Sequence, residues 1–587
     1  MSRTRRSPAP VAALALAGAL LAAALPAGAD AGGPGDLVAS YIDRWVAFYP
    51  SRAYARGHAP SAARFEQVTP ETVAQWLAFN RATAASARER LAGTGLAAER
   101  RTDLAVLAGA AEDELANWAE DRPLRAQPGW YAERVSQALT HLLVRDEPAG
   151  AARSEAALAR LAGVEALCRQ GVDALETGRT LRTEAALRTL AGARTFYGEG
   201  LPGIVADWPR AAEVVAAATR AADAIAALEA HLRDAVLPAA DPSPALGPAV
   251  YAAKLSRRTG GVYTPVTLRD TARDEIRRTR ALMVDEAARW QTSLSPAPPE
   301  PLAGEALLAA ALAAMEDDRT RDQAALLEEF VTLTAQAEAF VEAEDIATVP
   351  KPTTLVVDLS PAHFSGAAIG GVYPSGPFDP GADTLFYVPS IPDSAPAGAR
   401  EGFYRSFNTH FNTMIISHEM FPGHYLQYKV AVSAAPAVRT LFASGSYTEG
   451  WGSFSEELML DAGWAGDAPL TRLAHLRKRL ENATRAYVSV QVHTAGWGRD
   501  EVLAFARDEG LLAPQFAINL WQRVVNSPLQ ITDYMTGYLV FKRLYAAQHD
   551  AGAAPRAWVD TVLRAGPLPL ALLESELARA HAAPPGH

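Results

Sequence analysis

Cysteine is almost absent from this sequence, which contains a single one, Cys168. One cysteine cannot form an internal disulfide, a thiolate zinc site or an iron–sulfur cluster. Cys168 falls within an apolar stripe of three- and four-residue spacing in the segment 158–175, so we interpret it as a small core residue. Any chemistry must therefore rely on histidines, carboxylates or hydroxyls.

An excess of positive charge is also missing. The chain has 55 Lys and Arg against 66 Asp and Glu, which gives a net charge of −11. Nucleic acid partners call for a surplus of Lys and Arg to neutralise phosphates, so they are excluded. With 587 residues, of which 49% are hydrophobic and 21% charged, the composition is typical of a folded globular protein with one large or two ordinary domains.

Long apolar runs are absent except near the N-terminus, where residues 11–25 are apolar. Arginines at positions 3, 5 and 6 precede this run, and Ala27-Gly28-Ala29 follows it. This order predicts a signal peptide over residues 1–29 and a periplasmic or secreted mature protein with no stable membrane insertion. A retained N-terminal anchor is the alternative, although the run is short for a membrane span. No cysteine lies at the cleavage point, so no lipid anchor is expected.

In the rest of the chain, helical patterns come first and a mixture of helix and strand patterns follows. Residues 36–237 show helical spacing of apolar side chains, and Pro/Gly-rich breaks follow at 237–248 and 293–303. The β-branched and aromatic runs 353–359 and 383–391 predict two strands of a small sheet joined by a long loop. We expect an N-terminal helical region over 30–250 and a catalytic region over 251–587, together forming one continuous unit over 36–580.

The segment 403–459 carries the clearest chemical signal. Two histidines, His418 and His424, flank a Pro-Gly pair, and Glu419 follows the first of them. Zinc-binding histidines on a regular helix are four residues apart, whereas a spacing of six places them about 240° apart around the axis. Pro422 cannot donate a hydrogen bond to the carbonyl four residues earlier, so the helix must break or bulge there. Such an interruption would return His424 to the side of His418.

A third metal ligand is expected from the segment 447–460. Glu449 and, seven residues later, Glu456 lie on one helical face, and Gly450 and Gly452 indicate that another element packs closely there. The alternative is that the histidines are hydrogen-bonded core residues and the glutamates are solvated helix charges. That alternative explains neither the Pro-Gly interruption nor the clustering. The other histidines considered, at 363, 410 and 475, are interpreted as ordinary structural residues.

These residues resemble a family of bacterial secreted proteins catalogued as domain of unknown function 885. The first shared motif, His-Glu-x-x-Pro-Gly-His-x-x-Gln, spans His418–Gln427, and the second, Tyr-x-Glu-Gly-Trp, spans Tyr447–Trp451. The resemblance implies a mostly α fold, a large helical zincin-like metallopeptidase with a small β-sheet near the active-site helix. It also implies one Zn²⁺ held by His418, His424 and Glu449, with Gln427 and Glu456 supporting the ligands.

The resemblance continues downstream with one departure. His493 and Trp497 fit a family pattern, but Ser489 and Gln491 replace its Asp and Gly. A second pattern is matched by Arg523, Pro528, Gln530, Tyr534 and Gly537. In related zinc peptidases a His and a Tyr from late helices donate hydrogen bonds to the developing oxyanion, which makes His493 and Tyr534 the candidates. Arg523 and Tyr373 are the candidate substrate-binding residues.

Together these features predict an exported zinc-dependent hydrolase that cleaves peptide bonds, with short peptides as substrates and Glu419 as general base. The strand predicted at 383–391 is expected to offer a sheet edge to an extended peptide. Two alternatives stay open: a non-catalytic helical peptide- or solute-binding protein, and a zinc hydrolase of a non-peptide amide.

Overall fold

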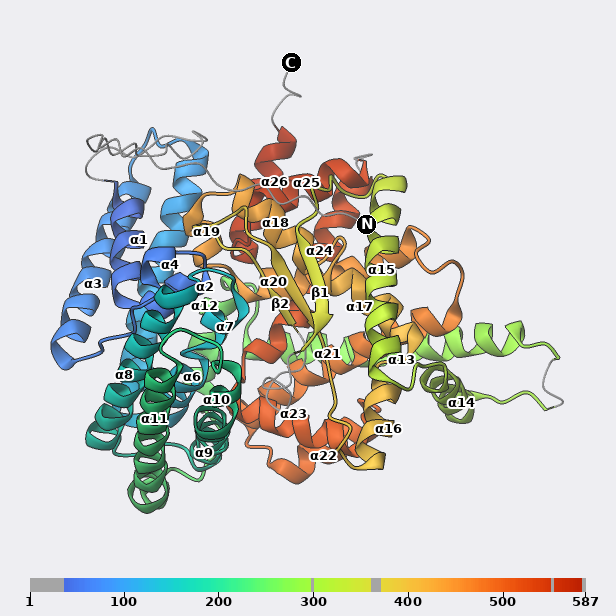
Figure 1. Cartoon of the computed structure of the whole chain (residues 1–587). Helices are drawn as coiled ribbons and strands as arrows, with labels where there is room; N and C mark the ends of the chain where they lie inside the picture. The colour runs from blue at the N-terminus through green and yellow to red at the C-terminus, as the bar shows by residue number, and fades with distance from the viewer. Residues whose placement is uncertain (1–35, 297–299, 361–370, 551–553, 583–587) are drawn as a thin grey trace, which may run out of the picture.

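The computed structural model describes residues 36–296, 300–360, 371–550 and 554–582 (Figure 1). Helix accounts for 73% of the structure and strand for 3%, so the prediction of a mostly α fold with a small sheet is confirmed. The predicted signal peptide lies outside the described residues. Within those residues, no helix combines the length and the apolar character that crossing a membrane requires.

The first part of the chain forms an array of helices. They are α1 (Leu37–Phe48), α2 (Pro50–Ala55), α3 (Pro70–Ala92), α4 (Ala98–Asp121), α5 (Pro123–Ala126), α6 (Pro128–Gln137), α7 (Thr140–Val144), α8 (Gly150–Ala174), α9 (Thr180–Thr195), α10 (Leu201–Ile204), α11 (Ala211–His231) and α12 (Pro248–Thr259). Helices α3, α8, α9 and α11 form the left side of the molecule in Figure 1. Cys168 is fully buried in the core that α6, α8, α9 and α11 share, as predicted.

Longer helices and the sheet follow. The helices are α13 (Pro265–Ser293), α14 (Gly304–Asp317), α15 (Gln323–Ala343), α16 (Ala397–Ser406), α17 (Thr409–Glu419), α18 (His424–Ala434), α19 (Ala437–Leu441), α20 (Gly445–Asp461), α21 (Pro469–Ala495), α22 (Arg499–Asp508), α23 (Pro514–Asn526), α24 (Asp533–Asp550), α25 (Pro555–Ala565) and α26 (Leu570–Ala582). Short 3₁₀ or π turns are η1 (Ala59–Ser61), η2 (Phe196–Gly200), η3 (Leu232–Val236), η4 (Leu237–Ala239) and η5 (Gln530–Thr532). Proline occupies the first turn of many of these helices, where its missing N–H leaves no bond unmade.

The sheet contains three strands where the sequence predicted two. Strands β1 (Leu355–Leu359) and β3 (Thr384–Val388) match the predicted runs, and β2 (Gly371–Tyr373) was missed because it is three residues long in a Gly/Pro-rich stretch. The strand order is β1-β3-β2, with β1 parallel and β2 antiparallel to β3. The predicted sheet edge at 383–391 is therefore wrong: β3 is the central strand, and its two neighbours already pair with both of its sides.

The largest hydrophobic core joins the start of the chain to its last third. It contains Tyr41, Trp76 and Leu107 from the first helices together with Ile416 of α17 and Trp451 of α20. The sheet is tied to the same region, because the backbone N–H of Thr354 donates to Tyr425 Oη of α18 at 3.0 Å. Residues on both sides of position 250 thus pack in one core around α17, α18 and α20.

Candidate metal centre

The helix carrying the first histidine stops where the sequence predicted. Helix α17 ends at Glu419 and α18 begins at His424, so the Pro422-Gly423 pair lies between two separate helices. Gly423 is required there, since a Cβ at this position would lie 2.0 Å from the carbonyl oxygen of His418. The indole Nε1–H of Trp451 donates to the carbonyl of Pro422 at 2.9 Å and so fixes the connection to α20.

This interruption brings the two imidazoles together. The ring centroids of His418 and His424 lie 4.7 Å apart, with the ring planes at 83°. A regular helix would point these side chains away from each other. The predicted approach of the two histidines is therefore confirmed.

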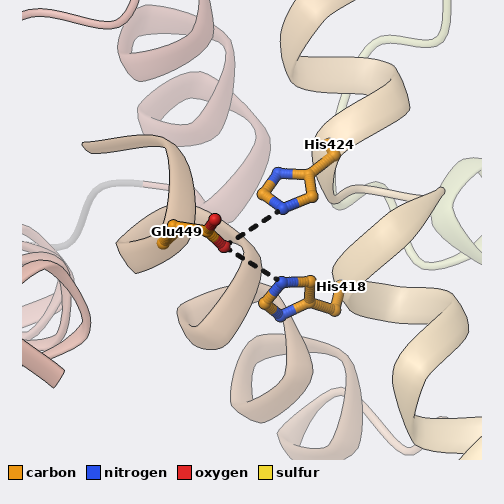
Figure 2. Close-up of side chains that lie close together, drawn as sticks. All are labelled: His418, His424 and Glu449. Atoms are coloured by element: carbon orange, nitrogen blue, oxygen red, sulfur yellow. Dashed lines mark ion pairs between the residues drawn. The ribbon is translucent and has the colours of Figure 1, made fainter. Parts of the chain in front are cut away.

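Glu449 reaches the two imidazoles from a third helix, α20 (Figure 2). Its Oε2 lies 3.8 Å from Nε2 of His418 and 3.6 Å from Nε2 of His424. One potential ligand atom from each of the three residues lies within 4.8 Å of the others. His418 and His424 are buried, while the Glu449 side chain is 22% exposed, so solvent reaches the cluster at the carboxylate.

Hydrogen bonds on the far side of each ring set its orientation. Nδ1–H of His418 donates to Oε1 of Glu456 at 2.8 Å, and Nδ1–H of His424 donates to Oε1 of Gln427 at 3.4 Å. In both rings this leaves Nε2 directed at Glu449. Partners of this kind fix the tautomer of metal-binding histidines. The structure thus places Glu456 and Gln427 where the sequence predicted, next to the ligand candidates.

Glu456 also contacts His475, whose link to the cluster the sequence analysis did not predict. Its second oxygen, Oε2, accepts a hydrogen bond from Nδ1 of His475 at 2.8 Å. His475 is buried and hydrogen-bonded, as expected of a structural histidine, but it belongs to the support of the cluster. His410 is also structural, with Thr471 Oγ1 at 3.0 Å, and His363 lies outside the described residues.

Close helix packing places Glu449 and explains the two glycines beside it. A Cβ on Gly450 would lie 2.3 Å from Cα of Gly537 in α24, and a Cβ on Gly452 would lie 2.8 Å from the His418 ring. Neither position can carry a side chain if α20 is to approach α24 and α17 this closely. The prediction of a tightly packed element at these glycines is confirmed.

Charge in the cluster favours a cation. Burial alone would lower the pKa of His418, but hydrogen bonds to Glu449 and Glu456 outweigh burial and raise this pKa to about 10. Burial alone would likewise raise the pKa of the Glu449 carboxyl, yet the two imidazoles hold it well below its usual range. The carboxylates of Glu449 and Glu456 therefore stabilise positive charge on or beside the imidazoles.

Tyr534 borders the cluster, as predicted. Its ring stacks on His418 with centroids 6.4 Å apart and planes at 22°. Gln530 links the two sides of the site, since its Nε2 donates to Oε1 of Glu449 at 3.4 Å and to the Tyr534 hydroxyl at 3.2 Å. Arg523 Nη2 donates to Oε1 of the same amide at 2.9 Å. Three residues of the downstream sequence pattern thus form one hydrogen-bonded group, in which Gln530 connects Arg523 and Tyr534 to Glu449.

Residues 50–577 match the bacterial protein family of unknown function DUF885. The chain belongs to the DUF885 family. The fold is shared with a proposed lipoprotein of unknown function from Shewanella oneidensis, at 19% identity and a TM-score of 0.75 over 92% of this chain and 99% of that one. A second structure, a proposed lipoprotein from Colwellia psychrerythraea, has 15% identity and a TM-score of 0.74 over 93% of this chain and 98% of that one. No curated protein matches the sequence.

His493 lies in the segment where the sequence departs from the DUF885 pattern. The fold does not bring its side chain to the cluster. Its Nδ1 accepts a hydrogen bond from the backbone N–H of Leu246 at 3.2 Å, and its Nε2–H donates to the carbonyl of Val524 at 3.0 Å. The side chain is fully buried, and burial lowers its pKa to about 4. Both ring nitrogens are thus satisfied by the main chain, which leaves no donor for the predicted oxyanion role.

Among the described residues, no ring contact or hydrogen bond joins Tyr373 of β2 to His418, His424 or Glu449. The ring contacts of Tyr373 are with His141, at 6.2 Å between centroids, and with Tyr387 of β3, at 5.5 Å. These contacts join the sheet to α7. They provide no geometric support for the predicted substrate-binding role of Tyr373, whereas Arg523 does lie beside the cluster.

Proposed function

We propose that this chain is an exported zinc-dependent hydrolase of peptide bonds. The observation that carries the proposal is the convergence of His418 Nε2, His424 Nε2 and Glu449 Oε2, with both Nδ1 atoms engaged elsewhere. Two imidazoles and one carboxylate form a ligand set typical of catalytic zinc, which keeps a fourth position open.

The residues present fit a zinc ion in number, chemistry and spacing. Two ligands of one tetrahedral zinc, each about 2.0–2.2 Å from the ion, lie about 3.3–3.6 Å apart. The observed separations of 3.6 Å and 3.8 Å between Glu449 and the imidazoles need to change by only a few tenths of an ångström. A divalent cation would also balance the charges of Glu449 and Glu456, whose carboxylates lie beside the two nitrogens of the buried His418 ring.

Zinc in this position would polarise the substrate carbonyl and lower the pKa of water. Glu419 is the residue placed to move the protons. It is the last residue of α17, half-buried directly after His418, and within the described part of the chain it makes no hydrogen bond or ion pair. Its carboxylate is therefore free to accept a proton from the attacking water and to deliver it to the leaving amine.

Tyr534 supplies the hydrogen bond to the carbonyl oxygen as that oxygen becomes negative. Its hydroxyl oxygen already accepts from Gln530, so its own O–H remains available to a substrate. Burial, and to a smaller extent the charge of Glu449, raises the pKa of Tyr534, which keeps the hydroxyl protonated at neutral pH. A preorganised donor of this kind lowers the barrier by a few kcal/mol.

Two observations support export. The sequence begins with a basic segment, an apolar run and small residues at 27–29, which is typical of a signal peptide. The two structures with the same fold are described as proposed lipoproteins, a class carried by the cell envelope. We therefore place the mature protein in the periplasm or outside the cell.

The test is a digest of a mixed peptide library by the purified protein loaded with zinc, with Glu419→Gln as the matched variant. Both proteins should contain about one zinc per chain, and only the wild type should release fragments. Zinc binding without cleavage of any peptide would contradict the peptidase proposal and favour a non-peptide amide. A protein that binds peptides but no zinc would favour the binding-protein alternative.

A further inference from the structure

Two arginines flank the ring of Tyr534 and a lysine lies close to them, and the proposed reaction uses none of these three cations. The guanidinium carbons of Arg485 and Arg523 lie 5.2 Å and 5.9 Å from the centroid of the Tyr534 ring. Lys478 lies on α21 two turns before Arg485, and it is close enough to Arg523 and Glu481 for their charges to affect its own pKa. The cations thus come from two helices, α21 and α23.

Among the described residues, Glu481 is the only carboxylate in direct ion-pair contact with these cations. Glu481 forms an ion pair with Arg485 and lies 3.4 Å from Nζ of Lys478. Burial would raise the pKa of Glu481, but the charges of Arg485 and Lys478 hold it near 2, so this carboxylate is fully ionised and already committed. The second hydrogen bond of Arg485 goes to a neutral group, Oδ1 of Asn482, at 3.0 Å.

Arg523 has no carboxylate partner among the described residues. Its hydrogen bond goes to the neutral amide of Gln530, at 2.9 Å. Arg523 is only half-buried, so a ligand can reach it, whereas Arg485 is 9% exposed and held in place by Glu481. A partly desolvated guanidinium that no carboxylate contacts directly gains most from a ligand that presents a carboxylate to its planar pair of donors.

The position of Arg523 relative to the cluster limits where such a ligand would be cut. The side-chain amide of Gln530 links Arg523 to Glu449 and to the Tyr534 hydroxyl, through hydrogen bonds of 2.9 Å, 3.4 Å and 3.2 Å. Each residue of an extended peptide spans at most about 3.5 Å, so this separation corresponds to about two residues.

We propose that Arg523, with Arg485 and Lys478 adding to the positive potential, binds the terminal carboxylate of the peptide substrate. The chain then releases one or two residues from the carboxyl end of peptides. This inference rests on the proposed function and adds to it the class of substrate: peptides with a free carboxyl end. A substrate ending in a carboxamide leaves Arg523 unpaired. An unpaired charged group in a partly buried site costs binding free energy, so such a substrate should bind and react much less well.

The inference is tested with two N-acetylated random pentapeptide libraries that differ only in ending as a carboxylate or a carboxamide. The zinc-loaded protein should cleave the carboxylate library at the last or second-last bond, with kcat/KM at least about 100-fold above that for the carboxamide library. Arg523→Ala should abolish this preference by slowing cleavage of the carboxylate form, and Arg523→Lys should restore part of it. Arg507→Ala, which alters an exposed arginine paired with Asp508 on α22, should leave the preference unchanged.

A binding measurement separates this inference from the proposed function. Zinc-loaded Glu419→Gln should bind the carboxylate peptides at least about tenfold more tightly than the carboxamides, and Arg523→Ala in that background should remove the difference. Equal cleavage and equal binding of both libraries would overturn the carboxylate site while leaving the zinc peptidase intact. Zinc binding and a carboxylate preference without any cleavage would instead overturn the peptidase and retain the role of Arg523.

Discussion

Nδ1 of His418 lies 2.8 Å from Oε1 of Glu456, and both side chains are almost completely buried. The contact joins α17 to α20 and commits His418 to presenting Nε2 to Glu449. It depends on the absent side chain of Gly452, which lets the helix pass directly over the imidazole ring. Glu456 therefore acts by holding a ligand, while Glu449, seven residues earlier on the same helix, acts as the ligand itself.

This division of roles predicts different losses of zinc affinity. Glu456→Gln should weaken zinc binding by about 10–100-fold, because the hydrogen bond to His418 loses its charge but the ligand set stays complete. Glu449→Gln should weaken binding much more, because one ligand is lost. Competition with a coloured chelator measures both affinities, with Glu286→Gln, in an ion pair with Arg289, as a control. Retention of zinc by Glu449→Gln together with its loss from Glu456→Gln would reverse the assignment.

The helix interruption between the histidines should be essential for metal binding. Replacing Pro422-Gly423 by Ala-Ala raises helix propensity, but the new Cβ at position 423 collides with the carbonyl of His418. We expect this variant to lose zinc binding and to have a lower Tm. The matched control is Gly192→Ala in α9, where a Cβ meets nothing within 4 Å, and it should raise stability by about 0.5–1 kcal/mol.

Calorimetric unfolding together with zinc titration decides this prediction. Zinc affinity equal to that of the wild type in the Ala-Ala variant would show that the two histidines do not need the break. A similar fall in Tm for both variants would show that the strain at position 423 is not specific.

Zinc affinity should rise with pH. Without metal, the pKa of His418 is about 10, so this imidazole is protonated at neutral pH and must release its proton before Nε2 binds zinc. Between pH 6 and 9 the apparent affinity should therefore increase by up to about tenfold per pH unit, and level off above pH 10. Calorimetry in buffers of different ionisation enthalpy should detect about one proton released per zinc from this residue at pH 8. An affinity independent of pH over this range would contradict the structure.

The same pKa makes the metal-free protein sensitive to alkaline pH. Because the pKa of His418 is raised above its ordinary value of about 6.5, its protonated form stabilises the fold fully below pH 6.5. That contribution is lost as the pH rises through about 10. The Tm of the metal-free protein should consequently fall between pH 7 and 10, and zinc should reduce this fall because it replaces the proton.

Tyr534 and His493 should respond differently to substitution. Tyr534→Phe should retain zinc and the fold but lower kcat by about 10²–10³-fold, as expected when one oxyanion donor is removed. His493→Ala should lower Tm, because it removes the bonds to Leu246 and Val524, and leave the kcat of the folded protein close to normal. Steady-state kinetics with zinc content measured on the same samples distinguishes the two effects. A large loss of kcat in His493→Ala without loss of Tm would contradict the structural role.

The cluster was predictable from sequence to the extent that its chemistry is local. The six-residue spacing, Pro422 and Gly423 require a helix break, and the position of Glu449 on a neighbouring helix follows from ordinary helical geometry. His475 was interpreted correctly as a structural histidine, but its link to the site was not predicted because that link runs through Glu456 and depends on how α20 packs against α21. The misplaced edge strand has a similar cause, since the order β1-β3-β2 is set by pairing with a three-residue strand that has almost no sequence signal.

The central claim is that one zinc ion binds among His418, His424 and Glu449, and anomalous diffraction at the zinc absorption edge tests it most directly. Crystals of the zinc-loaded protein should show a single strong anomalous peak within about 2.0–2.2 Å of His418 Nε2, His424 Nε2 and Glu449 Oε2. A peak elsewhere, for example beside His475, or no peak in protein that has been saturated with zinc, would contradict the assignment.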